Sequence, residues 1–218
     1  AARGREHRAL AGGGELGRSP YIGVMSLEAL LADISACRAC AGELAHEPRP
    51  VTMVSAQTRL LICGQAPGRR VHESGLPFTD PSGDRLRAWM GVDAQTFYGR
   101  PEIGVAAMAF CFPGTNPKGG DYPPPPRCAE LWRAPLLARL PKVELTLLVG
   151  GYAQSWALGD AMGGNMTDTV RAWRDYAPAV LPMPHPSWRN TGWLKRNPWF
   201  EEEVTPYLRQ RVLEILAS

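Results

Sequence analysis

The sequence has no run of about 18 apolar residues, which excludes a helix long enough to span a membrane. It also has no internal repeat, which excludes solenoids and propellers. The first 24 residues are rich in glycine and arginine and have no apolar stretch, so we expect no secretory signal there, only a disordered tail or a leftover of expression. The remaining residues, 25–218, are long enough for one domain with a single core, which we expect to be monomeric and cytoplasmic.

The sequence also has little excess of charge of either sign. The net charge is +3, and four arginines and two glutamates lie within residues 1–24, which leaves +1 for residues 25–218. Overall electrostatics therefore neither requires nor excludes a nucleic acid partner. Any affinity for DNA has to come from a local patch of basic side chains.

Four apolar segments are predicted as strands because each is a short run bounded by turn residues. They are Leu60–Cys63, Ile103–Phe110, Val143–Val149 and Val180–Met183, with Val51–Met53 as an edge strand. Helical patterns alternate with them: Leu27–Ile34 capped by Ser26, Gly83–Met90 capped by Ser82, Cys128–Leu140 ended or kinked at Pro135, Tyr152–Leu158, and Phe200–Leu216 interrupted at Pro206. This alternation predicts a three-layer α/β/α sandwich around a mostly parallel sheet of about four strands.

The four strands end in loops with unusual residues: residues 64–68 (GQAPG), residues 111–116 (CFPGTN), Gly150-Gly151 and residues 185–187 (HPS). In a parallel sheet these loops gather at one edge, where open α/β folds bind their ligands. We therefore expect the functional site at that edge.

Cysteine is sparse, with five residues, but four of them form a pattern. Cys37 and Cys40 are spaced C-x2-C, and Cys111 and Cys128 follow far downstream, whereas Cys63 lies in an apolar strand and is expected to be a small buried side chain. Disulfides are rare in cytosolic proteins, so four converging thiols favour a metal site. Spacing alone leaves open a structural zinc ion, a 4Fe-4S cluster or reduced structural cysteines.

Several motifs together resemble the uracil-DNA glycosylase superfamily: the GQAPG turn at residues 64–68, Phe78 ten residues later, and the HPS loop at residues 185–187. The order of the four cysteines is similar to that of its iron-sulfur branch. That resemblance extends from about Leu27 to the C-terminus. It implies a 4Fe-4S cluster, bound by Cys37, Cys40, Cys111 and Cys128, that ties the N-terminal helix to the later loop and helix.

The resemblance also implies how the base is bound. Phe78 matches the aromatic residue that stacks on the extruded base. The turn residues Gln65 and Ala66, continued by Pro67 and Gly68, match the group that binds a base carbonyl.

His185 matches the histidine that donates a hydrogen bond to the negative charge developing on the departing base. Ser187, Trp188 and Arg189 follow it and are expected to contact the DNA, because a hydroxyl and amides bind a phosphate while an aromatic or arginine side chain fills the gap left by a flipped base.

The sequence departs from the family pattern at two positions. Ala66 stands where several members carry a water-activating aspartate, and Ala107 stands where the iron-sulfur branch has a base-reading asparagine. Asn116 is our candidate for the missing amide, and His72 joins His185 and Gln65 as a catalytic candidate because it follows the turn. The carboxylates considered for assisting water are Glu73, Asp80 and Asp84.

We therefore expect a DNA-repair glycosylase that acts on uracil-containing DNA, removes uracil or a related deaminated base and leaves an abasic site. Ala66 and Ala107 keep open a uracil-DNA binding module with reduced catalysis. A zinc-stapled α/β hydrolase, or another enzyme whose turn cradles a phosphate, is the third alternative.

Overall fold

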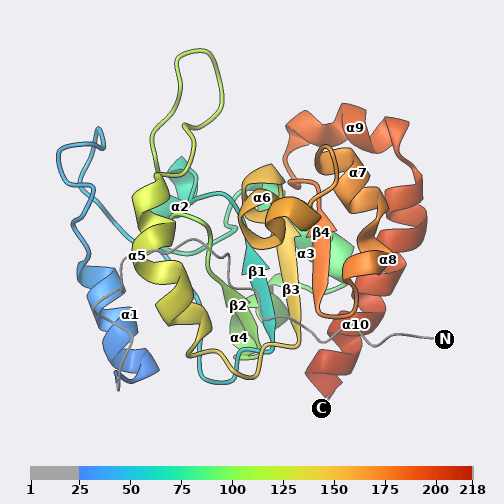
Figure 1. Ribbon diagram of the computed structural model, residues 1–218, viewed down its shortest axis with the longest axis horizontal. Helices are drawn as coiled ribbons and strands as arrows, with labels where there is room; N and C mark the ends of the chain where they lie inside the picture. Colours follow the sequence, from blue (N-terminus) through green and yellow to red (C-terminus); the bar gives the residue numbers. More distant parts are fainter. Residues whose placement is uncertain (1–24, 218) are drawn as a thin grey trace.

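The computed structural model describes residues 25–217, so the tail expected at residues 1–24 lies outside it (Figure 1). The strands are β1 (Leu60–Cys63), β2 (Ile103–Val105), β3 (Leu145–Val149) and β4 (Val180–Met183). The first helices are α1 (Leu27–Ala36), α2 (Arg69–Ser74), α3 (Pro81–Met90), α4 (Ala94–Gly99) and α5 (Pro126–Leu137). The later ones are α6 (Gly151–Leu158), α7 (Met166–Arg171), α8 (Trp173–Tyr176), α9 (Thr191–Arg196) and α10 (Thr205–Ala217), with short 3-10 turns η1 (Gly159–Ala161) and η2 (Trp188–Asn190) and a π-helical turn η3 (Phe200–Val204).

The four strands form one parallel sheet in the order β2-β1-β3-β4, which confirms the predicted sheet. Every residue of every strand is buried, as expected for a parallel sheet covered on both faces. Pro182 is tolerated in β4 because β4 lies at the edge of the sheet and need not donate a further ladder bond.

Helices cover both faces, which gives the three layers (Figure 1). Leu60 and Ile62 of β1 point to one face and pack in a cluster with residues of α3, α4, η3 and α10. Leu61 points to the other face and packs with residues of α1 and α5, while Cys63 packs near α6. This alternation follows from the two-residue period of a strand.

Strand β2 is shorter than predicted, ending at Val105 rather than at Phe110. The carbonyls of Ala106 and Ala107 turn toward the guanidinium of Arg133, whose Nη1 lies 2.7 and 3.4 Å from them. Arg133 is only 2% exposed, and no carboxylate among residues 25–217 forms an ion pair with it. The carbonyls that would have continued the strand therefore accept hydrogen bonds from a buried guanidinium.

Two other predicted boundaries were also wrong near the sheet. Residues 51–53 do not form an edge strand, because only Met53 makes an isolated antiparallel bridge, with Val105. The helix expected at Gly83 begins at Pro81 with Asp80 as its N-cap, and the Ser82 hydroxyl donates to the Asp80 carboxylate over 2.7 Å instead of capping the helix.

Prolines interrupt the helices less than predicted. Helix α5 begins at Pro126, two residues before the expected start, and continues past Pro135 to Leu137. At the C-terminus, the π-helical turn η3 ends at Val204 and α10 follows directly with Pro206 in its first turn. The Glu201 carbonyl in the preceding turn accepts from the Thr205 hydroxyl over 2.8 Å. Helices α2, α4, α7, α8 and α9 were not predicted; α2, α4, α7 and α9 have six residues each and α8 has four.

In the part of the chain described here, no helix is both long enough and apolar enough to cross a membrane.

Candidate active site

A pocket lies at the carboxyl edge of the sheet, where the segments that follow β1, β2 and β4 meet. It brings together most of the residues predicted from the sequence to bind or act on the base. Its lining includes Gln65, Ala66, Pro67, Gly68, Phe78 and His185, together with Asp80, Ala107 and Asp121. Residues from three strand ends and two intervening segments thus converge on one cavity.

Phe78 is held in a left-handed backbone conformation, with φ of 56°, which a bulky side chain rarely adopts. Its carbonyl accepts hydrogen bonds from Arg87 Nη1 and the Tyr98 hydroxyl, each over 3.0 Å. Gly83 allows this arrangement, because a Cβ at that position would lie 1.8 Å from the Phe78 oxygen. The surrounding structure therefore forces a conformation that presents the ring to the pocket.

The turn at residues 64–68 is fixed by the segment that follows β2. Met108 donates its backbone N–H to the Gly64 carbonyl over 2.8 Å, and Ala109 donates to the Gln65 carbonyl over 3.1 Å. The Gln65 side-chain amide donates to the Tyr122 carbonyl over 3.0 Å. Gln65 therefore has its amide nitrogen engaged by a neighbouring loop, while its backbone remains part of the pocket wall.

His185 follows β4 on a loop that sets the orientation of its ring. The backbone N–H of Ser187 donates to Nδ1 of His185 over 3.2 Å, and Asn190 Nδ2 donates to the His185 carbonyl over 2.7 Å. Burial lowers the pKa of His185, and the opposing effect of the Asp80 carboxylate is smaller. Because Nδ1 accepts a hydrogen bond, we infer that the neutral ring carries its proton on Nε2 and is a donor there.

The polar groups of the pocket differ from those expected. Ala107 lines it, so the side chain at this position offers no hydrogen bond to a base. Two carboxylates, Asp80 and Asp121, line it as well, and sequence analysis did not single out Asp121. The available signal was its position: Asp121 follows Gly119-Gly120 in the continuation of a loop already expected at this edge.

Residues 51–209 match the family model described as the uracil DNA glycosylase superfamily. The chain belongs to this superfamily. Every residue of the pocket named above falls within the matched range, whereas Cys37 and Cys40 precede it. A Methanosarcina acetivorans protein, proposed to be a uracil DNA glycosylase and solved by solution NMR, aligns with a TM-score of 0.46 at 16% identity, covering 73% of this chain and 94% of that chain.

In this member of the superfamily, Asn116 does not line the pocket at the sheet edge, contrary to our expectation. Its Oδ1 accepts a hydrogen bond from the backbone N–H of Lys118 over 2.9 Å, and its own N–H donates to the Gly120 carbonyl over 2.8 Å. Asn116 thus closes the tip of a hairpin, a common use of asparagine in turns. From the same hairpin it is Asp121 that reaches the pocket.

His72 also lies outside the lining of the pocket. It faces away on α2, with its ring centroid 4.3 Å from that of His46 and 6.0 Å from that of Phe112. Its Nδ1 is buried and has no hydrogen-bond partner among residues 25–217, and burial together with His46 and Arg49 lowers its pKa. The placement gives His72 no direct contact with the pocket that we predicted it would serve.

The three residues predicted to contact DNA follow His185 directly. Ser187 caps the turn η2, since its hydroxyl accepts from the Arg189 backbone N–H over 3.2 Å, and its carbonyl accepts from Arg85 over 2.9 Å. Trp188 is 72% exposed, and the guanidinium carbon of Arg189 lies 5.3 Å from its ring centroid. The superfamily member thus presents an exposed aromatic ring and a cation on the loop that carries His185.

The four predicted metal ligands line a second pocket. Cys37 and Cys40 follow α1, Cys111 follows β2, and Cys128 lies in α5, while most of the remaining wall is apolar. Burial raises the pKa of the Cys111 thiol to about 11 and that of Cys128 to about 12, and the neighbouring thiols add to the shift. Across residues 25–217, no group of three or more histidine, cysteine, aspartate or glutamate side chains is arranged so that it could hold a metal ion.

Cys63 behaves differently from these four, as predicted. It is fully buried in β1, and its Sγ lies 3.7 Å from the Met108 sulfur.

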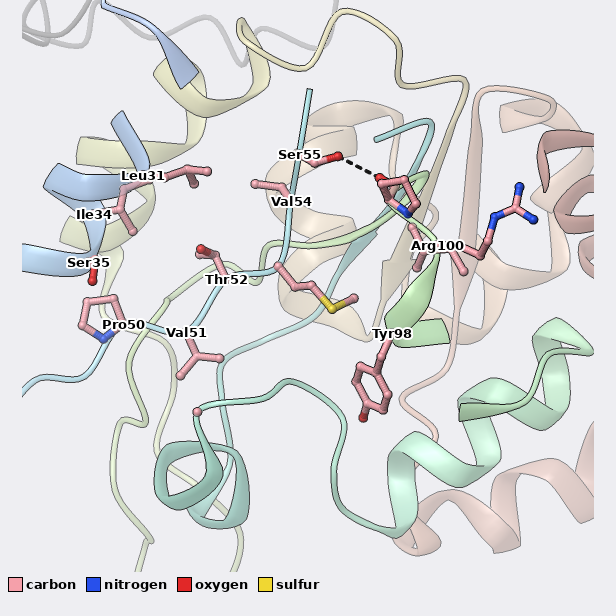
Figure 2. Close-up of a pocket in the computed structure, with 14 residues that line it drawn as sticks. Leu31, Ile34, Ser35, Pro50, Val51, Thr52, Val54, Ser55, Tyr98 and Arg100 are labelled. Carbon is pink, nitrogen blue, oxygen red and sulfur yellow. Dashed lines mark hydrogen bonds between the residues drawn. The ribbon is translucent and has the colours of Figure 1, made fainter. Parts of the chain in front are cut away.

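Figure 2 shows a third hollow, between α1, residues 50–55 and β2. Two of its polar side chains are engaged within the protein: the Ser55 hydroxyl donates to the Pro101 carbonyl over 2.9 Å, and Arg100 pairs with Glu102 over 3.1 Å. The Tyr98 hydroxyl, which donates to the Phe78 carbonyl, connects this hollow to the pocket lined by Phe78 and His185. Tyr98 thus supports the position of Phe78, and the residues that line the hollow include no cysteine, histidine or carboxylate.

Proposed function

We propose that the protein is a DNA glycosylase that hydrolyses the N-glycosidic bond of uracil, or of a related deaminated base, in DNA. The observation that carries the proposal is the convergence of the GQAPG turn, Phe78 and His185 on one pocket in a chain of the uracil DNA glycosylase superfamily. This membership favours a glycosylase over the phosphate-binding hydrolase that the sequence alone left open.

Cleavage of the bond leaves negative charge on the base and makes the sugar cation-like. The extruded base would stack on Phe78, which is prepared for this by its fixed backbone, while the turn backbone at Gln65 and Ala66 binds a base carbonyl. His185 donates from Nε2 to the oxygen that gains negative charge. A donor oriented before the reaction lowers the barrier because the protein need not reorganise.

The exposed loop at residues 187–189 suits the extrusion step. Trp188 or Arg189 would fill the space that the flipped nucleotide leaves in the stack, and Ser187 would contact a phosphate. Trp188 and Arg189 are available for this role because they lie against each other and, within residues 25–217, the Arg189 guanidinium forms no ion pair with a carboxylate.

We further propose that the pocket lined by the four cysteines Cys37, Cys40, Cys111 and Cys128 binds a 4Fe-4S cluster. The donor set fits: four thiols from three separate segments line one largely apolar cavity. A cluster holds its thiolates farther apart than a single ion does, because four irons lie between them. When bound, it would cross-link α1, the loop after β2 and α5 as a structural support, with no part in the hydrolysis.

The test is incubation of the protein with a uracil-containing oligonucleotide, followed by hot alkali, which breaks the strand at an abasic site. We expect strand breakage with the native protein and loss of breakage with His185→Ala. Oligonucleotides with hypoxanthine or xanthine then establish the preferred base. Tight binding to uracil-containing DNA without breakage would contradict the proposed activity and support a binding module, an outcome that Ala66 and Ala107 make worth measuring.

A further inference from the structure

Residues 114–122 form a hairpin whose geometry is tightly fixed. Thr115 and Asp121 make an antiparallel bridge, and the Tyr122 N–H donates to the Gly114 carbonyl over 2.9 Å. The hairpin is tied to the catalytic turn, since the Gln65 side chain donates to the Tyr122 carbonyl over 3.0 Å. The backbone of Asp121 therefore has a defined position beside residues 64–68.

The Asp121 side chain points over this turn. A Cβ placed on Gly68 would lie 3.7 Å from the Oδ2 atom of Asp121. Asp121 lines the same pocket as Ala66, Phe78 and His185. Asp121 is exposed, whereas Ala107 in the same pocket is buried. A base inserted between Phe78 and His185 would fill the deeper part of the pocket, and its sugar would then lie at the mouth, on the side of Asp121.

The charges around Asp121 keep it suited to accept a proton. Although the residue as a whole is exposed, partial desolvation of its carboxyl group is the largest effect and raises its pKa, as does the Asp80 carboxylate, whereas the Thr115 side chain, Arg189 and Arg69 lower it. No basic nitrogen among the described residues lies within ion-pair distance of its carboxylate. A carboxylate with a raised pKa and no ion-pair partner is a better base than an ordinary one.

The three carboxylates predicted from the sequence to assist water are less suited than Asp121 to act as a base in the pocket. Asp84 is paired with Arg87 over 2.6 Å at the start of α3, and Asp80 accepts the Ser82 hydroxyl over 2.7 Å. Glu73 is exposed on α2 and does not line the pocket. Two carboxylates, Asp80 and Asp121, therefore line the pocket. Asp80 lies at the start of α3 and accepts the Ser82 hydroxyl, whereas Asp121 does not lie at the start of a helix.

We propose that Asp121 supplies the catalytic carboxylate that Ala66 cannot, by orienting a water molecule against the sugar and taking its proton. This deepens the proposed glycosylase function and rests on it. The bond between C1′ and the base nitrogen breaks, and its electron pair leaves with the base. The water oxygen bonds to C1′, one of its protons passes to the Asp121 carboxylate, and this proton is later returned to the base or to solvent.

The first measurement is the single-turnover rate of uracil excision with excess enzyme. Asp121→Asn keeps the size of the side chain and one acceptor oxygen but removes the negative charge, so we expect the rate to fall about 100-fold. Asp160→Asn, an exposed carboxylate outside the pocket lining, serves as the matched control and should keep the native rate. A rate for Asp121→Asn within about threefold of the native one would overturn the proposal.

The second measurement separates a catalytic charge from a structural role and does not require excision. Single-stranded DNA carrying a protonated pyrrolidine at the abasic position mimics the sugar cation, and the tetrahydrofuran analogue is its neutral match. We expect the native protein to prefer the cation about tenfold, as one nearby charge provides, and Asp121→Asn to lose this preference while Asp160→Asn keeps it.

A preference that survives in Asp121→Asn would overturn the proposal even if the excision rate falls, because the hairpin would then have a structural role. If the native protein excises no base at all, the proposed function fails, but the carboxylate is still tested. Loss of the cation preference on substitution would place Asp121 at the sugar, and no preference in the native protein would reject that placement.

Discussion

Replacing His185 with alanine tests the central chemical step. The ring is oriented by the Ser187 N–H on Nδ1, so the substitution removes one prearranged donor from the pocket and leaves the turn at residues 64–68 in place. Removal of a comparable oxyanion donor in other enzymes costs about 3 kcal/mol, or about 100- to 1000-fold in rate. We expect a loss of this size in the single-turnover rate of uracil excision, measured with excess enzyme so that product release does not contribute.

The matched control is His72→Ala, since the His72 ring contacts His46 and Phe112 outside the base pocket. It should keep a nearly native rate of excision, and Asp80→Asn should lose less than His185→Ala. If His185→Ala remained close to native while a variant of Glu73, Asp80 or Asp84 lost its activity, stabilisation of the departing anion would not be the main source of catalysis.

Three other measurements test the remaining features. Protein purified without oxygen should be brown, with broad absorbance near roughly 400 nm and about four irons per chain, and Cys128→Ser should lose this colour; zinc without iron would refute the cluster. Replacing Trp188 and Arg189 with alanine should weaken excision from duplex DNA more than from single strands, which need little unpairing energy, so equal losses would contradict a role in extrusion. Burial lowers the pKa of both His185 and His72 in the folded protein. As the pH drops below about 6.5, these histidines therefore bind protons in the unfolded chain before they do so in the folded protein, and the free energy of unfolding should fall until the pH is below the folded-state pKa values. His72→Gln should reduce this fall in thermal melts between pH 8 and 5, and an unchanged slope would show that His72 does not contribute.

The sheet could be predicted because its strands are short, continuous apolar runs bounded by turn residues, a pattern that depends only on local sequence. Its second strand was predicted too long because Arg133, distant in sequence, takes the carbonyls of Ala106 and Ala107. Nothing in the apolar run at residues 103–110 signals a buried guanidinium 23 or more residues later. Tertiary contacts outweighed local preference there.

The pocket residues that belong to a recognisable sequence motif could be predicted. The side chain that a loop turns into the pocket could not be predicted. The GQAPG turn, Phe78 and His185 do meet in one pocket. Asn116 was chosen from its loop for its amide, but its side chain closes the hairpin, and Asp121 faces the pocket instead. Spacing along a loop does not reveal this choice, because it depends on the hydrogen bonds between Thr115, Asp121 and their neighbours.

The left-handed backbone at Phe78 sets backbone strain against side-chain packing at this position. A residue with a Cβ in that conformation costs on the order of 1 kcal/mol or more, a cost that glycine would avoid. Phe78→Gly should therefore relax the backbone while it removes the ring on which the base would stack. The relief of strain is opposed by the loss of the ring's edge-on packing against Phe97, whose ring centroid lies 6.3 Å away, so backbone strain alone does not favour replacing Phe78.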